Sequence, residues 1–447
     1  MNSQSMELSP SGHIPSEIQQ ASAVLKHLFQ GFKGRLAFRF WNGTTVKLGN
    51  FISNKQQPDF TLVCRNQRVI RAILLGHDPL RFVEAYFRDD LDIEGNIFDA
   101  VSLKDCLYAP QISLLQKVSA LFSVLRLKAD DSGSEASLCA NTVRAHSKAE
   151  NREAIAFHYD VSNDFYALWL DAAMVYSCAY FESAEATLEQ AQQAKLDHIC
   201  RKLLLKPGER FLDVGCGWGA LVMHAAKHYG VHAHGITLSQ RQLELANKRI
   251  QEAGLQDRVT VELLDYRDIP GEAVYDKISS VGMFEHIGLA NLPAYFDIVN
   301  RQLKPGGLFL NHGITHDVEG WEKTLSTKFI NRYVFPDGQL DTVSNIQRVM
   351  ERSRFEILDV EALRSHYAMT LRNWVARLEQ HHTQALQYVS EATYRVWRLY
   401  MAACALEFES GEIGVYQILS GKRNNGKSVT PLTRRHLYSE RSVSINP

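Results

Sequence analysis

Short apolar runs alternate with helical patterns along the second part of the chain. A run of about four to eight apolar residues suits a strand that is buried on both faces. We predict such strands at Arg210–Val214, Val231–Ile236, Val259–Leu263, Lys277–Val281, Leu308–His312, Phe355–Val360 and Val415–Leu419. Strands that alternate with helices form a mostly parallel, doubly wound α/β sheet, which binds its ligands beyond the carboxyl ends of the strands.

The N-terminal part shows a different pattern, because apolar and polar residues alternate on both sides of Asn42-Gly43. This dipeptide between alternating runs predicts a β-hairpin. Two further strands and a helix are expected at Asp59–Cys64, Val69–Gly76 and Pro79–Phe87. We interpret His77, Asp89 and Asp90 as loop and cap residues rather than as a site. The pattern predicts a small α+β domain without obvious chemistry.

A polar stretch rich in Ser and Ala, Lys128–Arg152, separates the two parts. It has no sustained apolar period, which is typical of a linker. We therefore predict an N-terminal accessory domain at 1–127, a linker at 128–152 and a catalytic domain at 153–447.

The composition adds limits on function. Of the 447 residues 45% are hydrophobic and 22% are charged, and the net charge is −1, which disfavours a nucleic-acid binder that acts through its overall charge. No apolar run is long enough to span a bilayer, and the N-terminus has no signal pattern. The seven scattered cysteines suit reduced thiols in a cytoplasmic protein and show no metal-ligand spacing, so we expect no metal site.

The clearest local motif is RFLDVGCGWGA, residues 210–220. Gly215, Gly217 and Gly219 occupy every second position after the first strand of the sheet, and a predicted helix follows. Glycines let the backbone approach a ligand closely, and a helix N-terminus offers unpaired N–H groups. Asp213 precedes the first glycine and suits a ligand with a positive charge better than a pyrophosphate.

The loops after the next two strands limit the choice of ligand. A dinucleotide site would have G-x-G-x-x-G and an acidic residue about 20 positions later. Thr237 stands where that acid is expected, which disfavours a nicotinamide oxidoreductase. Ser239 and Gln242 also match a capping box and could simply start a helix, while Tyr266 of the DYRD loop offers a ring for an adenine. A glycine loop alone could be only a tight connection, but three loops after three successive strands are more specific.

Nine motifs occur in order over residues 151–421: HYDVSNDFYALWLD, MVYSCAYF, LDVGCGWGAL, GITLSQRQ, DYRD, SVGMFEHIG, LKPGGLFLNHGI, FINRYVFPDGQL and CALEFESGEIGVYQ. In these the chain resembles the cyclopropane-fatty-acid-synthase family of S-adenosylmethionine-dependent methyltransferases, which includes the mycolic acid cyclopropane synthases. The resemblance implies a seven-stranded, doubly wound class I methyltransferase (Rossmann-like) fold with a small N-terminal α+β domain. It also implies that 321–338 and the helices of 363–408 bind the acyl chain.

The resemblance implies two sets of site residues. For S-adenosylmethionine they are Tyr159, Tyr176 and Ser177 at the methionine part, Asp213, Gly215, Cys216, Gly217 and Gly219 at the glycine loop, Thr237, Leu238, Ser239 and Gln242 at the ribose and adenosine, and Tyr266 and Arg267 at the adenine. For a bicarbonate ion they are Cys178, Glu285, His312, the Ile314 backbone and Tyr367, and Cys404 matches an active-site cysteine of the family.

The chemistry of an unactivated cis alkene explains these residue types. Methyl transfer from a sulfonium leaves a carbocation, so the protein has to position the reactants, exclude water and stabilise positive charge. A base must then take a proton from the added methyl group so that the ring closes. Glu285 and His312 would orient bicarbonate as that base, and Cys178 and Tyr367 would donate hydrogen bonds to it.

Each of these residues also has a structural alternative. Glu285 could cap the next helix, His312 could be a paired core histidine, and Cys178 and Cys404 could be small buried apolar residues. We favour packing for Cys404, because an alkene offers a thiolate no electrophile.

The leading hypothesis is a cyclopropane-fatty-acyl-phospholipid synthase that acts on unsaturated phospholipid acyl chains. We expect it in the cytoplasm, peripherally on the inner membrane surface, without a nucleic-acid partner and as a homodimer. Residues 421–441 hold six basic residues against one acidic residue, a net +5, which could attract anionic lipid or could be a solvated tail. The alternatives are a fatty-acyl methyltransferase with a methylene- or methyl-branched product, and a non-catalytic lipid-binding protein.

Overall fold

A computed structural model describes residues 6–7, 15–29, 31–53, 56–67, 69, 80–104, 162–319, 339–427 and 430–438. The described chain forms two compact units. One contains the described residues up to 104 together with 389–406, and the other contains the described residues of 162–388 and those from 407 onward. The linker predicted at 128–152 lies outside the described residues, so the domain boundaries remain predictions.

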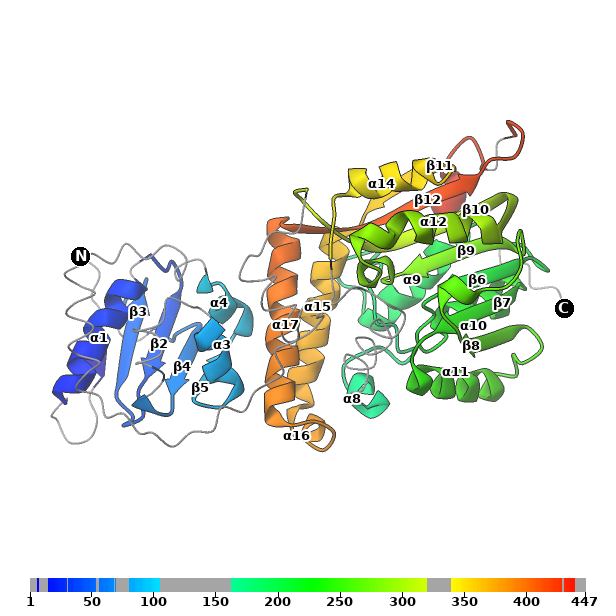
Figure 1. The fold of residues 1–447 in the computed structure, drawn as a ribbon. Coiled ribbons are helices and arrows are strands. Elements are labelled where there is room, and N and C mark those ends of the chain that lie inside the picture. Colours follow the sequence, from blue (N-terminus) through cyan, green and yellow to red (C-terminus); the bar gives the residue numbers. More distant parts are fainter. Residues whose placement is uncertain are drawn as a thin grey trace. The chain divides into compact units, whose positions relative to one another are not determined.

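The N-terminal unit is built on a five-stranded sheet in the order β1-β3-β2-β4-β5. Its elements are β1 (Met6–Glu7), α1 (Ser16–Leu28), β2 (Arg35–Arg39), β3 (Thr45–Gly49), β4 (Phe60–Cys64), α3 (Leu80–Phe87), β5 (Leu91–Gly95) and α4 (Ile97–Val101) (Figure 1). The antiparallel strands β2 and β3 form the predicted hairpin, and Gly43 takes a positive φ of 84° in its turn. Apolar residues of β2, β3 and β4 pack with α1 into one core, which confirms the α+β prediction.

Residues 389–406 join this unit through two buried arginines of helix α17 (Glu391–Ser410). The Arg395 guanidinium donates to the carbonyl oxygens of Tyr86 and Leu91 at 2.8 and 3.1 Å and pairs with Asp89 at 2.6 Å. Arg398 donates to the Tyr86 hydroxyl at 3.1 Å. Asp89 therefore has the structural role expected of it, and α17 contains residues of both units.

The larger unit contains a seven-stranded sheet in the order β11-β12-β10-β9-β6-β7-β8. The strands are β6 (Arg210–Val214), β7 (His232–Thr237), β8 (Val259–Leu263), β9 (Tyr275–Val281), β10 (Leu303–His316), β11 (Phe355–Ala362) and β12 (Ile413–Lys422). Neighbours pair in parallel, except that β12 is antiparallel to both β10 and β11. All seven predicted strands are present, with ends that differ by up to five residues.

Both faces of this sheet are covered by helices (Figure 1). Helices α9 (Leu188–Lys202), α10 (Ala220–Tyr229) and α11 (Gln240–Glu252) share a core with Phe211 of β6 and Leu308 and Leu310 of β10. Helices α12 (Leu292–Gln302) and α14 (Val343–Arg352) pack on the other face with Leu212 and Phe309. Because successive strand residues point to opposite faces, a continuous apolar run serves both cores.

Candidate active site

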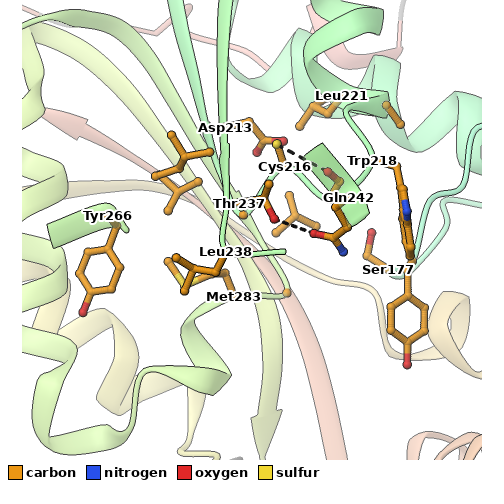
Figure 2. Close-up of a pocket in the computed structure, with 18 of the residues that line it drawn as sticks. Ser177, Asp213, Cys216, Trp218, Leu221, Thr237, Leu238, Gln242, Tyr266 and Met283 are labelled. Carbon is orange, nitrogen blue, oxygen red and sulfur yellow. Dashed lines mark hydrogen bonds between the residues drawn. The ribbon is translucent and has the colours of Figure 1, made fainter. Parts of the chain in front are cut away.

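A pocket opens beyond the carboxyl ends of β6, β7, β8 and β9, where the sheet was predicted to bind its ligand (Figure 2). The loops after these four strands line it, together with residues 174–177 and helix α9. Figure 2 shows Tyr266 on one side, Ser177 and Trp218 on the other, and Thr237 and Gln242 between them. The pocket therefore brings together the three loops that the sequence singled out.

The glycine loop has the conformation that its composition suggests. Gly215, Gly217 and Gly219 have φ values of 82°, 55° and 83°, where residues with a Cβ atom are strained. Gly215, Cys216 and Gly217 line the pocket, whereas Gly219 does not and instead caps the start of α10. The tight-connection alternative thus accounts for Gly219, while the first two glycines also face the ligand space.

Asp213 is a buried carboxyl group at the end of β6 that lines the pocket. Its Oδ1 accepts a hydrogen bond from the Ser279 hydroxyl at 2.6 Å. Burial raises the pKa of Asp213 to about 6, although the Ser279 hydrogen bond and the charge of Lys195 oppose the rise. At neutral pH the group is mainly ionised, which favours a ligand with a positive charge.

Thr237, at the end of β7, and Gln242, in helix α11, are buried and form a hydrogen bond with each other. The Thr237 hydroxyl donates to Gln242 Oε1 at 2.7 Å and accepts from the Ser239 backbone N–H at 3.2 Å (Figure 2). Ser239 caps α11 by accepting from the Gln242 N–H, as its motif predicts. The Gln242 side chain turns to Thr237 instead of completing the capping box, and Thr237, Leu238 and Gln242 line the pocket.

Tyr266 closes the opposite side of the pocket and is held firmly by its neighbours. Its ring lies edge-on to Tyr295, with centroids 5.2 Å apart, and the Arg267 guanidinium lies 5.4 Å from the Tyr266 centroid. Arg267 is in turn fixed by two hydrogen bonds to Asp265, at 2.8 and 2.7 Å. This geometry presents an aromatic wall whose position is set before a ligand binds.

Tyr176 and Ser177 line the pocket within an aromatic cluster. The Tyr176 ring has its centroid 5.5 Å from that of Trp169 and 5.3 Å from that of Trp374. The Ser177 hydroxyl accepts a hydrogen bond from Lys195 Nζ at 2.8 Å. Sequence reasoning missed Lys195 and Trp218, because a basic residue and a tryptophan in helical or glycine-loop context carry no local motif of their own.

Glu285 lies on the short helix η2 (Phe284–His286) and is buried. Its Oε1 accepts from the Ile314 backbone N–H at 2.7 Å, so the structure joins two of the residues predicted for bicarbonate. Oε2 is buried without a hydrogen-bond partner in the described part of the chain. Burial raises the pKa of Glu285 to about 7, despite the Ile314 hydrogen bond.

His312 is buried on β10, two residues before Ile314 and on the same face of the strand. Gln417 Nε2 donates to His312 Nδ1 across 3.2 Å, which leaves Nε2 of the neutral ring as the proton donor. Burial holds the pKa of His312 well below its usual range. His312 Nε2 has no hydrogen-bond partner among the described residues, so the paired-core alternative accounts for only one of its two nitrogens.

Cys178 contacts Leu363, the residue before helix α15 (Arg364–Gln380), and Tyr367 lies in the first turn of that helix. The Cys178 thiol lies 3.3 Å from the Ala179 carbonyl oxygen and 3.7 Å from that of Leu363, and burial raises its pKa. The Tyr367 ring packs on Phe408, with centroids 4.7 Å apart. Cys178 is thus a buried thiol close to two carbonyl oxygens. A hydrogen bond from either Cys178 or Tyr367 to bicarbonate remains a prediction.

The remaining predicted site residues lie elsewhere. Cys404 is buried on α17 within 389–406, which belongs to the N-terminal unit, and it is not among the residues that line the pocket. Tyr159 and the aromatic stretch 321–338 lie outside the described residues. No group of His, Cys, Asp or Glu suited to a metal ion occurs in the described ranges.

Comparison with known proteins decides the family. Residues 146–418 match the family model described as mycolic acid cyclopropane synthetase. The chain belongs to this family. It is 41% identical to a probable fatty acid methyltransferase of Pseudomonas putida over 420 residues, which cover 93% of this chain and 99% of that protein. It is 42% identical to the cyclopropane-fatty-acyl-phospholipid synthase of Escherichia coli (strain K12) over 264 residues, 59% of this chain and 66% of that protein.

A solved structure extends the comparison to the fold. The mycolic acid cyclopropane synthase CmaA1, complexed with SAH and CTAB, matches with a TM-score of 0.58 and 35% identity over 61% of this chain and 98% of that chain. The larger unit therefore has the class I methyltransferase fold, and the chain is an S-adenosylmethionine-dependent methyltransferase of the cyclopropane synthase family. The pocket suits that cofactor, since Asp213 offers negative charge and Tyr266 an aromatic wall.

Proposed function

We propose that the protein transfers a methylene group from S-adenosylmethionine to cis double bonds of unsaturated phospholipid acyl chains and forms cyclopropane fatty acids. It would then be a cyclopropane-fatty-acyl-phospholipid synthase. The observation that carries this proposal is the half-paired carboxyl group of Glu285, which belongs to the same short helix as His286 of the pocket. A buried carboxylate with a free oxygen suits a step that handles a proton.

The cofactor supplies the methyl group as a sulfonium, and the protein has to manage the positive charge that passes to the acyl chain. Tyr176 lines the pocket and packs against Trp169 and Trp374. Aromatic faces stabilise a cation without trapping it covalently. The same cluster excludes water, which would otherwise add to the cation.

Bicarbonate, when bound, would supply the base that takes a proton from the added methyl group. Two buried atoms without hydrogen-bond partners in the described chain suit such an ion: Glu285 Oε2 would accept from its hydroxyl, and His312 Nε2 would donate to one of its carboxylate oxygens. The Ile314 N–H holds Glu285 in place at 2.7 Å. An acceptor and a donor match an ion that has both kinds of group better than they match a simple anion.

A branched product is the second candidate. It is favoured by the relative from Pseudomonas putida, which is named a probable fatty acid methyltransferase and aligns with 93% of this chain. The two outcomes share the carbocation and differ in its fate. Proton loss from the added methyl group closes the ring, whereas a hydride shift before proton loss leaves a methylene branch.

The substrate would be reached at the membrane surface from the cytoplasm, with the protein bound peripherally, as a homodimer and without nucleic acid. No helix in the described ranges is long and apolar enough to cross a membrane. Not every basic residue of 421–441 is available for lipid, because Lys422 Nζ donates to the carbonyl oxygens of Asn300 and Leu303 at 2.7 Å each and Arg434 pairs with Asp359. Arg423, Lys427 and Arg435 are the described basic side chains that support the proposal.

Incubation of the purified protein with S-adenosylmethionine and vesicles of unsaturated phospholipid tests the function. We expect the acyl chains to gain the mass of one CH2 group and to show the upfield proton signals of a cyclopropane ring by NMR. Vinylidene signals would establish the branched product instead. Protein that binds the cofactor but leaves the lipid unchanged would refute both candidates.

A further inference from the structure

Helix α9 holds the segment that carries Tyr176 and Ser177. Gln192 Nε2 donates to the carbonyl oxygens of Val175 and Ser177 at 3.3 and 3.0 Å. Lys195, three residues later on the same face of the helix, donates from Nζ to the Ser177 hydroxyl at 2.8 Å. Lys195 also lines the pocket, whereas Gln192 does not. The two residues share a positioning role, and Lys195 alone adds a charge to the ligand space.

The charge of Lys195 is not matched by a carboxylate in direct contact. Only 2% of the residue is exposed, and the hydrogen-bond partner that the described chain gives it is a neutral hydroxyl. Asp171 accepts from the N–H groups of Ala173 and Val175, and Asp213 accepts from Ser279, so both carboxylates are engaged elsewhere. Burial lowers the pKa of Lys195 to about 8, although Asp171, Cys178 and Asp213 oppose this at longer range. A buried ammonium group is costly unless an anion pairs with it.

The cofactor has one anionic group at neutral pH, the α-carboxylate of its methionine part. Tyr266 and Ser177 lie on opposite sides of the pocket, so a ligand with its adenine at Tyr266 extends its methionine part toward Ser177 (Figure 2). We propose that Lys195 binds the α-carboxylate of S-adenosylmethionine, with the Ser177 hydroxyl beside it. Asp213 then complements the positive charge of the same ligand. This inference rests on the assignment of the pocket to S-adenosylmethionine.

Calorimetry with two ligands isolates the carboxylate. S-adenosylhomocysteine and its decarboxylated analogue differ only in that group. The wild-type protein should bind the analogue about 10- to 100-fold more weakly, the range for a hydrogen bond to a charged group. Lys195→Met keeps the length and apolar stem of the side chain and removes the charge. It should weaken S-adenosylhomocysteine by about 10- to 100-fold more than it weakens the analogue, whose affinity changes only through the lost hydrogen bond to Ser177.

Gln192→Met is the matched control, because it loosens the same segment without removing a charge. It should weaken both ligands equally. Thermal melts of the two variants without ligand check that each is folded. Equal losses for both ligands in Lys195→Met would reduce Lys195 to the positioning role of Gln192, and unchanged binding of S-adenosylhomocysteine would also overturn the inference.

The binding test separates this inference from the proposed reaction. If the wild-type protein shows the carboxylate preference but converts no lipid, the reaction is wrong and the role of Lys195 stands. If the wild-type protein makes cyclopropane lipid while Lys195→Met binds both ligands normally, the role of Lys195 is wrong and the reaction stands.

Discussion

The residues that line the pocket and the buried residues around Glu285 differ in how completely their polar groups are paired. On the cofactor side, Thr237 is bonded to Gln242, Asp213 to Ser279 and Asp265 to Arg267. On the side of β9 and β10, Glu285 Oε2 and His312 Nε2 have no partner in the described chain. Leaving a buried polar atom unpaired costs about 1–3 kcal/mol. The difference indicates a preformed binding surface beside a region whose hydrogen-bonding capacity is kept for a ligand or a reacting group.

The largest expected effect comes from Glu285→Gln, which removes the charge from the incompletely paired side. Turnover should fall by at least about 100-fold, within the range of general acid–base catalysis. The affinity for S-adenosylhomocysteine should stay within about twofold, because the cofactor side keeps all its internal bonds. Steady-state kinetics and calorimetry measure the two quantities.

Glu252→Gln, at an exposed position on α11, is the matched control for the loss of one carboxylate. It should change neither turnover nor binding. If Glu285→Gln instead lost most of its cofactor affinity, Glu285 would be the structural helix-capping acid that the sequence left open.

Two glycine-to-alanine variants should separate the pocket from the buried region around Glu285. A Cβ atom at Gly313 would overlap the Phe284 ring and lie 2.9 Å from Glu285 Oε1, while one at Gly235 would lie 2.7 Å from Cys216 Sγ of the glycine loop. Overpacking of this kind costs about 1–3 kcal/mol. Gly313→Ala should lower turnover about 10-fold with cofactor affinity nearly unchanged, and Gly235→Ala should weaken the cofactor about 10-fold.

For both variants we would measure turnover at saturating cofactor and the calorimetric affinity for the cofactor. Melting temperatures show how far each variant is destabilised. The same ratio of the two losses in both variants would mean that the two sides act as one packed unit.

The sequence predicts the sheet well because its signal is local. Apolar runs such as Val259–Leu263 need no information from distant residues, and that strand has the predicted ends. Four N-terminal elements of the described chain were missed, β1, α1, β5 and α4, and Val69, the start of a predicted strand, is helical. The charged alternation of Leu91–Gly95 hides a strand that is recognisable only through its partner β4.

The site residues likewise divide into those with a local sequence motif and those placed by tertiary packing. Loops that follow strands carry motifs, so Gly215, Thr237 and Tyr266 could be placed in one pocket from the sequence. Lys195 could not, because its position depends on how α9 packs across the sheet. The Gln242 side chain accepts a hydrogen bond from Thr237 instead of completing the capping box. This contact depends on tertiary packing, so no capping motif predicts it.

The half-buried carboxyl group of Glu361 offers a further test of this comparison, through the pH dependence of stability. Burial alone would raise the pKa of Glu361, but the hydrogen bond from His198 and the charge of Lys202 lower this pKa to about 2. Its contribution to stability is present above the unfolded pKa near 4.5 and is lost as the pH falls toward 2. The stability contributed by Glu285 changes with pH in the opposite direction. Its pKa is raised from 4.5 to about 7, so stability falls as the pH rises through that window.

Denaturant unfolding at several pH values should show that the two variants change the free energy of unfolding in opposite directions. At pH about 7, Glu361→Gln should lose about 1–3 kcal/mol, and Glu285→Gln should gain an amount of the same order. The deficit of Glu361→Gln should shrink below pH about 4.5, and the gain of Glu285→Gln should vanish there too. A destabilised Glu285→Gln at neutral pH would show that the Glu285 carboxylate is fully compensated in the fold.

The smallest expected effect is on the paired side, in Thr237→Val. The variant keeps the shape of the side chain and loses the hydrogen bonds of the hydroxyl to Gln242 and to the Ser239 N–H. A net loss of about 1 kcal/mol corresponds to about fivefold weaker S-adenosylhomocysteine binding, with turnover at saturating cofactor unchanged. Thr237→Ser retains both bonds and should bind like the wild type. A collapse of turnover in Thr237→Val at saturating cofactor would mean that the cofactor side also shapes the reacting geometry, and the division between a preformed surface and a reserved one would fail.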